Sequence, residues 1–286
     1  MKIEIQGLKQ APGLYLVATP IGNLNDISIR ALECLNNVDV IYCEDTRQTK
    51  KLLNAYNIKT KTAIYHDHSS EAVREKIIKE IAEEAKSIAL VSDAGMPLIS
   101  DPGFKLVQAL RNENIPVTSI PGANAVLTAL QLSGLPTDPF TFLGFLPAKE
   151  QARKKELQKW EQTPATLVFY ESKQRVLKTL QNISELYGQR HISVVRELTK
   201  KFEEVISGSV NEVMEDIESR DELKGEIVVI VAPYAAEKYT QEQLHKDIMK
   251  QLKDGIPLKK ISENISLQSG WSKKDIYNEA LKLKDQ

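Results

Sequence analysis

The segment from residue 88 to residue 103 constrains the fold of this chain more than any other stretch. Residues 88–91 form an unbroken apolar run of β-prone residues, which is typical of a strand covered on both faces of a parallel sheet. Asp101 and Pro102 suit the N-cap and the first position of a following helix. The long loop between them contains Asp93, two glycines and two prolines. Because open α/β sheets bind ligands at the carboxyl ends of their strands, this loop is either a binding loop or an ordinary connection.

Length and composition limit the class of protein. A chain of 286 residues exceeds the usual single-domain size, so we expect two domains. With 42% apolar residues, 27% charged residues and a net charge of -1, it has the composition of a soluble globular protein, and any nucleic-acid surface must be local. Cys34 and Cys43 are too few for a disulfide framework, which predicts a reducing cytoplasm. The sequence also predicts no signal peptide and no membrane span.

The first half of the chain alternates between strand and helix patterns after a lead-in segment, residues 1–12. Predicted strands cover residues 14–18, 38–42, 62–65, 88–91 and 117–120. Predicted helices run from residue 26 or 28 to 36 and over 50–56, 70–86, 104–112 and about 121–134. This alternation indicates a parallel α/β layer with right-handed crossovers, and we assign the N-terminal α/β domain to residues 13–121.

The rhythm changes near residues 136–139, which indicates a domain junction between residues 121 and 139. Strands are predicted over 140–146, 166–170, 191–198, 202–207 and 226–231, with helices over 149–160, from 176 to about 187, and over 210–219. Mixed hairpin and crossover connections give residues 122–234 an α+β character. Residues 235–286 read as a helical extension with helices over 241–253, 258–268 and 272–284. That extension fits either a helix-turn-helix unit or a small helical cap.

Other strand ends also carry polar loops. The loop after the first strand, residues 19–23, lacks the Gly-x-Gly-x-x-Gly pattern and the Lys of a P-loop, and Pro20 has no N–H for a pyrophosphate, so a dinucleotide cofactor is disfavoured. Asp45 and Arg47 either form a solvated ion pair or belong to a shared cleft. The segment His66-Asp67-His68 has no third ligand nearby, so we predict a substrate-facing loop and no metal. Residues 147–155 and 196–201 concentrate positive charge, as a solvated face or a functional one.

Several motifs occur together in one order and spacing. They are Thr19-Pro-Ile-Gly-Asn-Leu24, Glu44-Asp-Thr-Arg47, Ser92-Asp-Ala-Gly-Met-Pro-Leu-Ile-Ser-Asp-Pro-Gly103, Pro121-Gly-Ala-Asn-Ala125, Gly144-Phe-Leu-Pro147, Phe169-Tyr-Glu-Ser172, Arg196-Glu-Leu-Thr-Lys200 and Gly225-Glu-Ile-Val228. Together they resemble the tetrapyrrole-methylase-like family over residues 13 to 232, and within it the branch that methylates ribosomal RNA. The helical tail also resembles the extension of that branch. Met96 departs from the threonine common there, and Lys173-Gln174 departs from Pro-His.

The resemblance implies two α/β domains of the tetrapyrrole methylase type, with S-adenosylmethionine in the cleft between them. It further implies methylation of the ribose 2'-oxygen of a cytidine in small-subunit ribosomal RNA by a homodimer. A cationic sulfonium needs carbonyls or a carboxylate nearby, so loops rich in Pro and Asp suit it better than a phosphate cradle. Two alternatives are methylation of a tetrapyrrole carbon by the same fold, and a noncatalytic RNA-binding assembly factor. The basic segments favour RNA over a tetrapyrrole.

We expect three sets of site residues. The cofactor set contains Thr19, Pro20, Asp93, Ala94, Gly95, Met96, Ser100, Pro121, Ala123, Asn124, Ala125, Tyr170, Gly225 and Glu226. The RNA-binding set contains Asp45, Arg47, His66, Lys149, Arg153, Lys154, Lys155, Lys173, Arg175 and Lys200. Glu171 is the first candidate for a proton acceptor, followed by Glu197 and Asp45. Arg196 and Lys200 would steady the adjacent phosphate or stabilise the developing alkoxide. Alternatively, Glu171 only pairs with an arginine and thereby joins the two domains.

Overall fold

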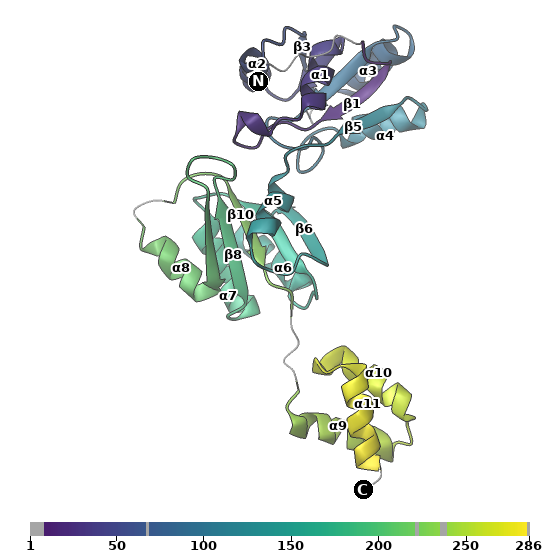
Figure 1. Ribbon diagram of the computed structural model, residues 1–286, viewed down its shortest axis with the longest axis vertical. Helices are drawn as coiled ribbons and strands as arrows, with labels where there is room; N and C mark the ends of the chain where they lie inside the picture. Colours follow the sequence, from purple (N-terminus) through teal and green to yellow (C-terminus); the bar gives the residue numbers. More distant parts are fainter. Residues whose placement is uncertain (1–8, 67–68, 221–222, 235–238, 285–286) are drawn as a thin grey trace.

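A computed structural model describes residues 9–66, 69–220, 223–234 and 239–284 (Figure 1). The first domain contains one sheet in the order β3-β2-β4-β1-β5, and all of its strand pairs are parallel. In chain order its elements are β1 (Gly13–Val17), the 3-10 turn η1 (Leu24–Asp26), α1 (Ile29–Asn37), β2 (Val40–Cys43), α2 (Thr46–Ala55), β3 (Thr62–Ile64), α3 (Glu71–Ala82), β4 (Ser87–Val91), α4 (Phe104–Asn112) and β5 (Val117–Ile120). The predicted parallel α/β layer is therefore confirmed.

Strand β4 lies at the centre of this sheet and is buried along its whole length, as its apolar run predicts. Successive side chains of a strand point to opposite faces. Ala89 and Val91 accordingly pack into the core formed with α1, whereas Ile88 and Leu90 pack against α3 and α4. With both faces covered, the sheet presents its binding surface only at the strand ends.

Several helix boundaries differ from the sequence prediction. Helix α3 ends at Ala82, before the predicted residue 86, and α5 begins at Ala125, after the predicted residue 121. Helix α4 does not begin at Asp101-Pro102 but at Phe104, behind Gly103 with a φ of +137°. The preceding loop folds back on β4 there, so that a Cβ on Gly103 would lie 2.7 Å from Leu98 Cδ1. Helix α2 begins at Thr46, earlier than expected, because the Asp45 side chain accepts a hydrogen bond from Arg47 N and caps the helix.

The second domain contains a mixed sheet in the order β6-β7-β10-β8-β9. Its elements are α5 (Ala125–Leu132), β6 (Phe140–Phe145), α6 (Glu150–Trp160), β7 (Thr166–Glu171), α7 (Val176–Tyr187), β8 (His191–Arg196), β9 (Glu204–Ser209), α8 (Val210–Glu218) and β10 (Ile227–Val231). Helix α5 packs on one face of the sheet, and α6, α7 and α8 pack on the other. Strand β10 is antiparallel to β7 and β8, so Ile227 pairs with both Glu171 and Arg196. The start of β10 thus lies beside the ends of its two neighbours.

The C-terminal region forms a three-helix unit of α9 (Gln241–Lys253), α10 (Leu258–Ser269) and α11 (Lys273–Lys284). Its own core contains Leu244, Ile248, Ile261, Ile265, Ile276 and Ala280. Gly270, with a φ of +65°, ends α10, and the indole N–H of Trp271 donates to the carbonyl of Tyr239 at 2.7 Å. Within the described ranges, every helix is too short or too polar to cross a membrane.

Candidate functional site

A cavity of about 570 Å³ lies where the loop edges of the two sheets meet. The first domain contributes one wall and the second domain the other. From the first come Ile21, Asp93, Ala94, Gly95, Met96, Ile99, Ser100 and Asp101; from the second come Asn124, Ala125, Phe145, Tyr170, Glu171, Ser172, Lys173, Gln174, Leu198, Gly225, Glu226, Ile227 and Val228. The cavity is within the size range of small-molecule sites, and it places carboxylates and apolar side chains around one space.

Two loops of the first domain are joined beneath this cavity. Thr19 and Gly95 exchange backbone hydrogen bonds, with Thr19 N donating to Gly95 O at 2.9 Å and Gly95 N donating to Thr19 O at 3.0 Å. The Thr19 hydroxyl donates to the carbonyl of Ser92 at 3.3 Å, and the Ser92 hydroxyl donates to the carbonyl of Ala94 at 3.2 Å. The buried Thr19 therefore fixes the conformation of the loop that contains Asp93, and we call this pair of contacts the Thr19–Gly95 clamp.

The same region contacts the second domain closely. Asn23 N donates to Thr199 Oγ1 at 3.0 Å, and a Cβ on Gly22 would lie only 2.5 Å from the carbonyl oxygen of Leu198. Position 22 therefore requires glycine, because any side chain would push the two domains apart. This contact sets the width of the cavity on one side.

Asp93 is an exposed carboxylate in the first wall. Desolvation, and secondly the negative charge of Asp45, raise the pKa of Asp93. Asp45 itself is held ionised, because hydrogen bonds from Arg47 lower the pKa of Asp45 to about 2. A positively charged group bound beside Asp93 would relieve this unfavourable environment.

The second wall is aromatic. The Tyr170 ring contacts Phe142 edge to face, with centroids 5.0 Å apart, and Phe145 at 5.2 Å. Burial, and secondly the charge of Asp101, raise the pKa of Tyr170 to about 12. Tyr170 therefore stays a neutral phenol at physiological pH and offers the cavity a ring and a hydroxyl.

Glu171 ends β7 with a side chain that is 0% exposed. One carboxylate oxygen accepts from Ser172 N at 2.8 Å, the other accepts from Thr179 Oγ1 at 2.6 Å, and Arg175 Nε lies 3.3 Å away. The carboxylate thus links the end of β7 to the start of α7. Its role as proton acceptor stays a prediction. These contacts favour a structural role within the second domain, because none of these partners belongs to the first domain.

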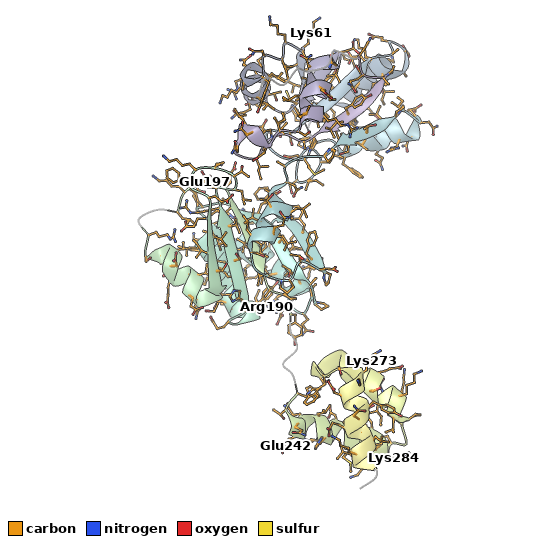
Figure 2. All side chains as sticks on the ribbon, viewed as in Figure 1. Lys61, Arg190, Glu197, Glu242, Lys273 and Lys284 are labelled. Atoms are coloured by element: carbon orange, nitrogen blue, oxygen red, sulfur yellow. The ribbon has the colours of Figure 1, made fainter. Side chains whose placement is uncertain are left out.

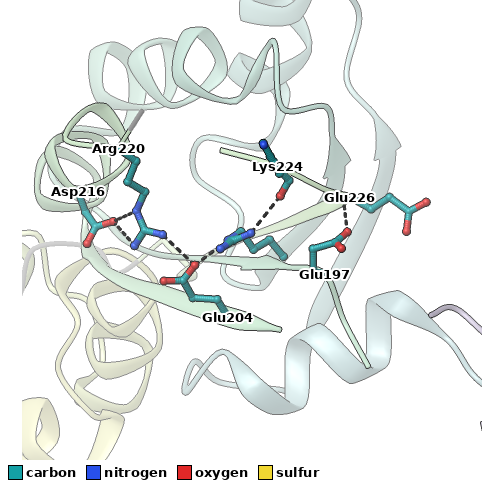
Figure 3. Close-up of polar contacts among 7 residues, drawn as sticks. Glu197, Glu204, Asp216, Arg220, Lys224 and Glu226 are labelled. Carbon is teal, nitrogen blue, oxygen red and sulfur yellow. Dashed lines mark hydrogen bonds and ion pairs between the residues drawn. The ribbon is translucent and has the colours of Figure 1, made fainter. Parts of the chain in front are cut away.

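Arg196 and Glu197 lie beside the cavity and do not appear among the described residues that line it. Arg196 Nε donates to Glu204 at 2.6 Å, and Arg220 donates to the same carboxylate at 2.8 Å (Figure 3). The Arg196 guanidinium also donates to the carbonyl of Lys224 at 3.2 Å, which holds the segment before Gly225. Arg196 is therefore occupied by a structural network.

Glu197 lies at the edge of the second domain that faces the first (Figure 2). It accepts from Lys200 at 2.9 Å, and this hydrogen bond is the main cause of the lowered pKa of Glu197. Desolvation disfavours the charge on Lys200, but its bonds to Glu197 and Glu226 outweigh that effect and raise the pKa of Lys200. Gly225 has a φ of +101°, and a Cβ there would lie 2.3 Å from Glu197 Oε1. The ion pair of Glu197 and Lys200 therefore packs directly against Gly225 of the cavity wall.

The predicted RNA-binding residues are scattered. Arg153 was assigned wrongly: it is 3% exposed, because its guanidinium donates to Asn182 at 2.8 Å and to the carbonyl of Ala148. Lys154 is paired with Glu150 and Glu185, and Arg175 donates to the carbonyls of Leu146 and Pro147. Arg47 is paired with Asp45.

Other members of this set stay predictions. Lys149 and Lys155 are exposed on the α6 segment, and Lys173 is exposed in the cavity wall. His66 is partly buried beside Ser69, and Asp67 and His68 lie outside the described residues. Among the residues described, no three histidine, cysteine, aspartate or glutamate side chains form a group that could hold a metal.

Of the predicted cofactor residues, the cavity is lined by Asp93, Ala94, Gly95, Met96, Ser100, Asn124, Ala125, Tyr170, Gly225 and Glu226. Thr19, Pro20, Pro121 and Ala123 are not part of the lining that the described residues form. The prediction missed Phe145 and the apolar residues Ile21, Ile99 and Leu198. A signal for Phe145 existed in the motif at residues 144–147, but its position depends on a strand irregularity that the sequence does not display.

A family model for tetrapyrrole (corrin/porphyrin) methylases matches residues 13–214. The chain belongs to this family. The resemblance predicted from the motifs is thereby confirmed, and so is the methylase fold with its two sheet-containing domains and C-terminal helices.

Relatives within this methylase family are similar over most of their length. The chain is 44% identical over 272 residues to ribosomal RNA small subunit methyltransferase I of Halalkalibacterium halodurans, covering 93% of each chain. It is 41% identical over 283 residues to the protein of that name from Mesorhizobium japonicum, covering 99% of this chain and 96% of the relative.

Solved structures show the same fold at low identity. A Thermus thermophilus uroporphyrin-III C-methyltransferase, complexed with S-adenosyl homocysteine, superposes with a TM-score of 0.53 at 18% identity, over 77% of this chain and 97% of the other. A diphthine synthase gives a TM-score of 0.57 at 14% identity, over 77% and 89%.

Proposed function

We propose that this chain is an S-adenosylmethionine-dependent methyltransferase that acts on small-subunit ribosomal RNA. The observation that carries the proposal is the cavity between two methylase-family domains, which joins a carboxylate loop to an aromatic wall. Relatives that are 41% to 46% identical are named ribosomal RNA small subunit methyltransferase I, which supports this substrate over a tetrapyrrole.

The chemistry of the cavity lining fits S-adenosylmethionine. The sulfonium and amino groups of the cofactor are cationic, and three carboxylates that could balance their charge line the cavity, namely Asp93, Asp101 and Glu226. Apolar atoms of Ile21, Ile99 and Leu198 suit an adenosyl group. When bound there, the cofactor supplies an electrophilic methyl group.

The residues of the chain act mainly by positioning. The Thr19–Gly95 clamp fixes the loop that contains Asp93, and the Gly22 contact fixes the distance between the two walls. Holding two reactants in a near-attack geometry supplies roughly 7 to 11 kcal/mol, and attack on a sulfonium methyl group needs no metal and no covalent enzyme intermediate. A well-defined cavity is therefore the main requirement.

The finer target is the ribose 2'-hydroxyl of a cytidine. Its oxygen forms the new bond to the methyl carbon, and its proton leaves to a nearby acceptor or to water. Glu171, Glu197 and Asp45 are the predicted acceptors, but each already accepts hydrogen bonds within the protein. Proton relay to water from an oriented hydroxyl is consistent with these contacts.

The proposal also covers the RNA contacts, the oligomeric state and the cellular location of the enzyme. The exposed lysines Lys149 and Lys155 of the α6 segment would contact phosphates, and the enzyme would work as a homodimer on the small subunit in the cytoplasm, where ribosomes are present. Since phosphate contacts release counterions, RNA affinity should fall steeply with salt.

The test incubates purified chain, labelled S-adenosylmethionine and small ribosomal subunits from cells that lack this gene. The proposal predicts methyl transfer and the appearance of 2'-O-methylcytidine in digested RNA, detected by mass spectrometry. Methylation of a base, or no transfer to any ribosomal particle, would contradict it. Transfer to a uroporphyrin-type tetrapyrrole instead would establish the alternative activity.

A further inference from the structure

Strand β6 contains an irregularity that determines where Phe145 points. Phe142 pairs with Val168 and Phe145 pairs with Tyr170, so three steps on β6 match two steps on β7. Gly144, with a φ of +64°, lies within this bulge. In a regular strand the side chains of Phe142 and Phe145 would point to opposite faces. The bulge brings both onto Tyr170, and bulges beside active sites commonly redirect a side chain in this way.

The redirected ring is largely uncovered. Phe145 exposes 61% of its surface although it lines the cavity, whereas Phe142 and Tyr170 are partly buried beneath it. The exposed ring turns a flat apolar face toward the cavity. Exposure of this apolar surface to water is unfavourable, and no contact among the described residues covers the face. The face is suited to another flat ring.

Phe145 is also held in place from behind. Arg175 donates to the carbonyls of the next two residues, Leu146 at 2.7 Å and Pro147 at 3.3 Å. The carboxylate of Glu171 lies 3.3 Å from Arg175 Nε, and Thr179 holds that carboxylate at 2.6 Å. A partly buried network therefore fixes the end of the bulged strand, which is the preorganisation that a stacking surface needs.

We propose that Phe145, supported by Tyr170, stacks on the base of the nucleotide whose ribose is methylated. This inference rests on the proposed function and adds a substrate subsite to it. Aromatic side chains that stack on unpaired bases are a general means of binding single-stranded RNA.

The position of the ring favours the substrate base over the adenine of the cofactor. Phe145 lies at the open rim of the cavity, whereas Gly95 and Val228, which line it more deeply, are buried. Lys173 lines the same cavity, and its positive charge suits an RNA phosphate and disfavours a cationic cofactor. The part of the rim that contains Phe145 and Lys173 is thus the RNA side of the cavity, whereas the exposed Asp93 belongs to the other wall.

The experiment compares Phe145→Ala, Phe145→Trp and, as a matched control, Phe104→Ala. Phe104 is 67% exposed on α4 and is not among the residues that line the cavity. For Phe145→Ala we expect the KM for small subunits to rise about tenfold, with the affinity for S-adenosylmethionine in calorimetry changed less than about twofold. Phe145→Trp should retain the wild-type KM, and Phe104→Ala should leave both quantities unchanged.

A second readout does not depend on activity. With S-adenosyl homocysteine present, the tryptophan of Phe145→Trp should be quenched when small subunits are added, beyond any change in the wild-type protein. Weaker cofactor binding by Phe145→Ala with an unchanged KM would overturn the inference and assign the ring to the adenine. The inference would also be overturned if Phe145→Ala kept the wild-type KM and cofactor affinity, as Phe104→Ala should, and Phe145→Trp showed no added quenching. Absence of transfer by the wild-type protein itself would instead contradict the proposed function.

Discussion

The two domains build the two walls of the cavity in different ways. In the first domain every described strand pair is parallel, so the strand ends and their loops gather at one edge. This wall consists of backbone, carboxylates and the apolar side chains of Ile21, Met96 and Ile99. In the second domain antiparallel pairing places the start of β10 beside the ends of β7 and β8, and the wall consists of aromatic rings and anchored ion pairs. Under the proposed function, the cofactor lies mainly against the carboxylate loop of the first wall, with Leu198 and Glu226 of the second, and the nucleotide lies against the aromatic face of the second wall.

The largest expected effect comes from forcing the walls apart. In Gly22→Val, the new Cβ would lie 2.5 Å from the carbonyl oxygen of Leu198, so the two domains must separate. We expect methyl transfer to fall about a hundredfold, because small misplacements of reactants have effects of that size. Activity should be measured together with thermal unfolding.

The control for this change is Gly134→Ala, since a Cβ on Gly134 meets nothing within 4 Å, whereas its φ of +70° strains the substituted backbone. It therefore lowers stability without changing the contact between the domains. It should retain most of the activity. A fully active Gly22→Val would mean that the contact between the loop at residues 19–23 and the segment at residues 198–200 does not set the cavity.

A smaller effect is expected from Glu171→Gln. This variant distinguishes a structural role of Glu171 from a role as proton acceptor. If Glu171 is an anchor, the variant weakens the charge-assisted hydrogen bonds from Ser172 N and Thr179 and loses the ion pair with Arg175, and its unfolding free energy should fall by about 1 to 3 kcal/mol. The pH profile of single-turnover methylation should keep its shape, and Thr179→Val should mimic the change in part. Loss of a kinetic pKa in Glu171→Gln alone would restore the role of proton acceptor.

The smallest effect concerns the lysines outside the cavity. Lys155→Ala should lower the slope of log affinity for RNA against log salt by about 0.7 to 0.9 and leave stability unchanged. Arg153→Ala is the contrasting variant on the same helix, because its buried guanidinium bonds to Asn182 and Ala148 would be lost. It should destabilise the protein and leave the salt slope intact. Equal slopes in Lys155→Ala and the wild-type protein would remove Lys155 from the RNA surface.

The sequence predicts the first wall better than the second for a physical reason. Alternating strand and helix patterns imply parallel pairing, and parallel strands bring their terminal loops together, so Asp93 and its neighbours could be named in advance. The start of α4 was misplaced because Asp101 and Pro102 have good helix-start propensity, whereas the packing of Leu98 and Leu90 against Gly103 is tertiary.

The second wall depends on features that periodicity does not reveal. The β6 bulge that presents Phe145 follows from its pairing with β7, and the burial of Arg153 follows from the partner Asn182 on another helix. A sequence shows that Arg153 is cationic but not that its charge is used internally. Charged residues on a predicted helix are thus a poor guide to an RNA surface without their partners.

The most direct test of the account is a calorimetric titration of S-adenosylmethionine into the wild-type protein and Asp93→Asn across pH. Desolvation, and secondly the charge of Asp45, raise the pKa of Asp93, so a cation bound beside it would stabilise its ionised form. We predict that wild-type affinity is highest above that pKa and falls as pH drops through it, since protonation removes the charge. Asp93→Asn should bind about tenfold more weakly at neutral pH, without this dependence. Equal affinities and identical pH profiles for the two proteins would contradict the assignment of the cofactor to this cavity.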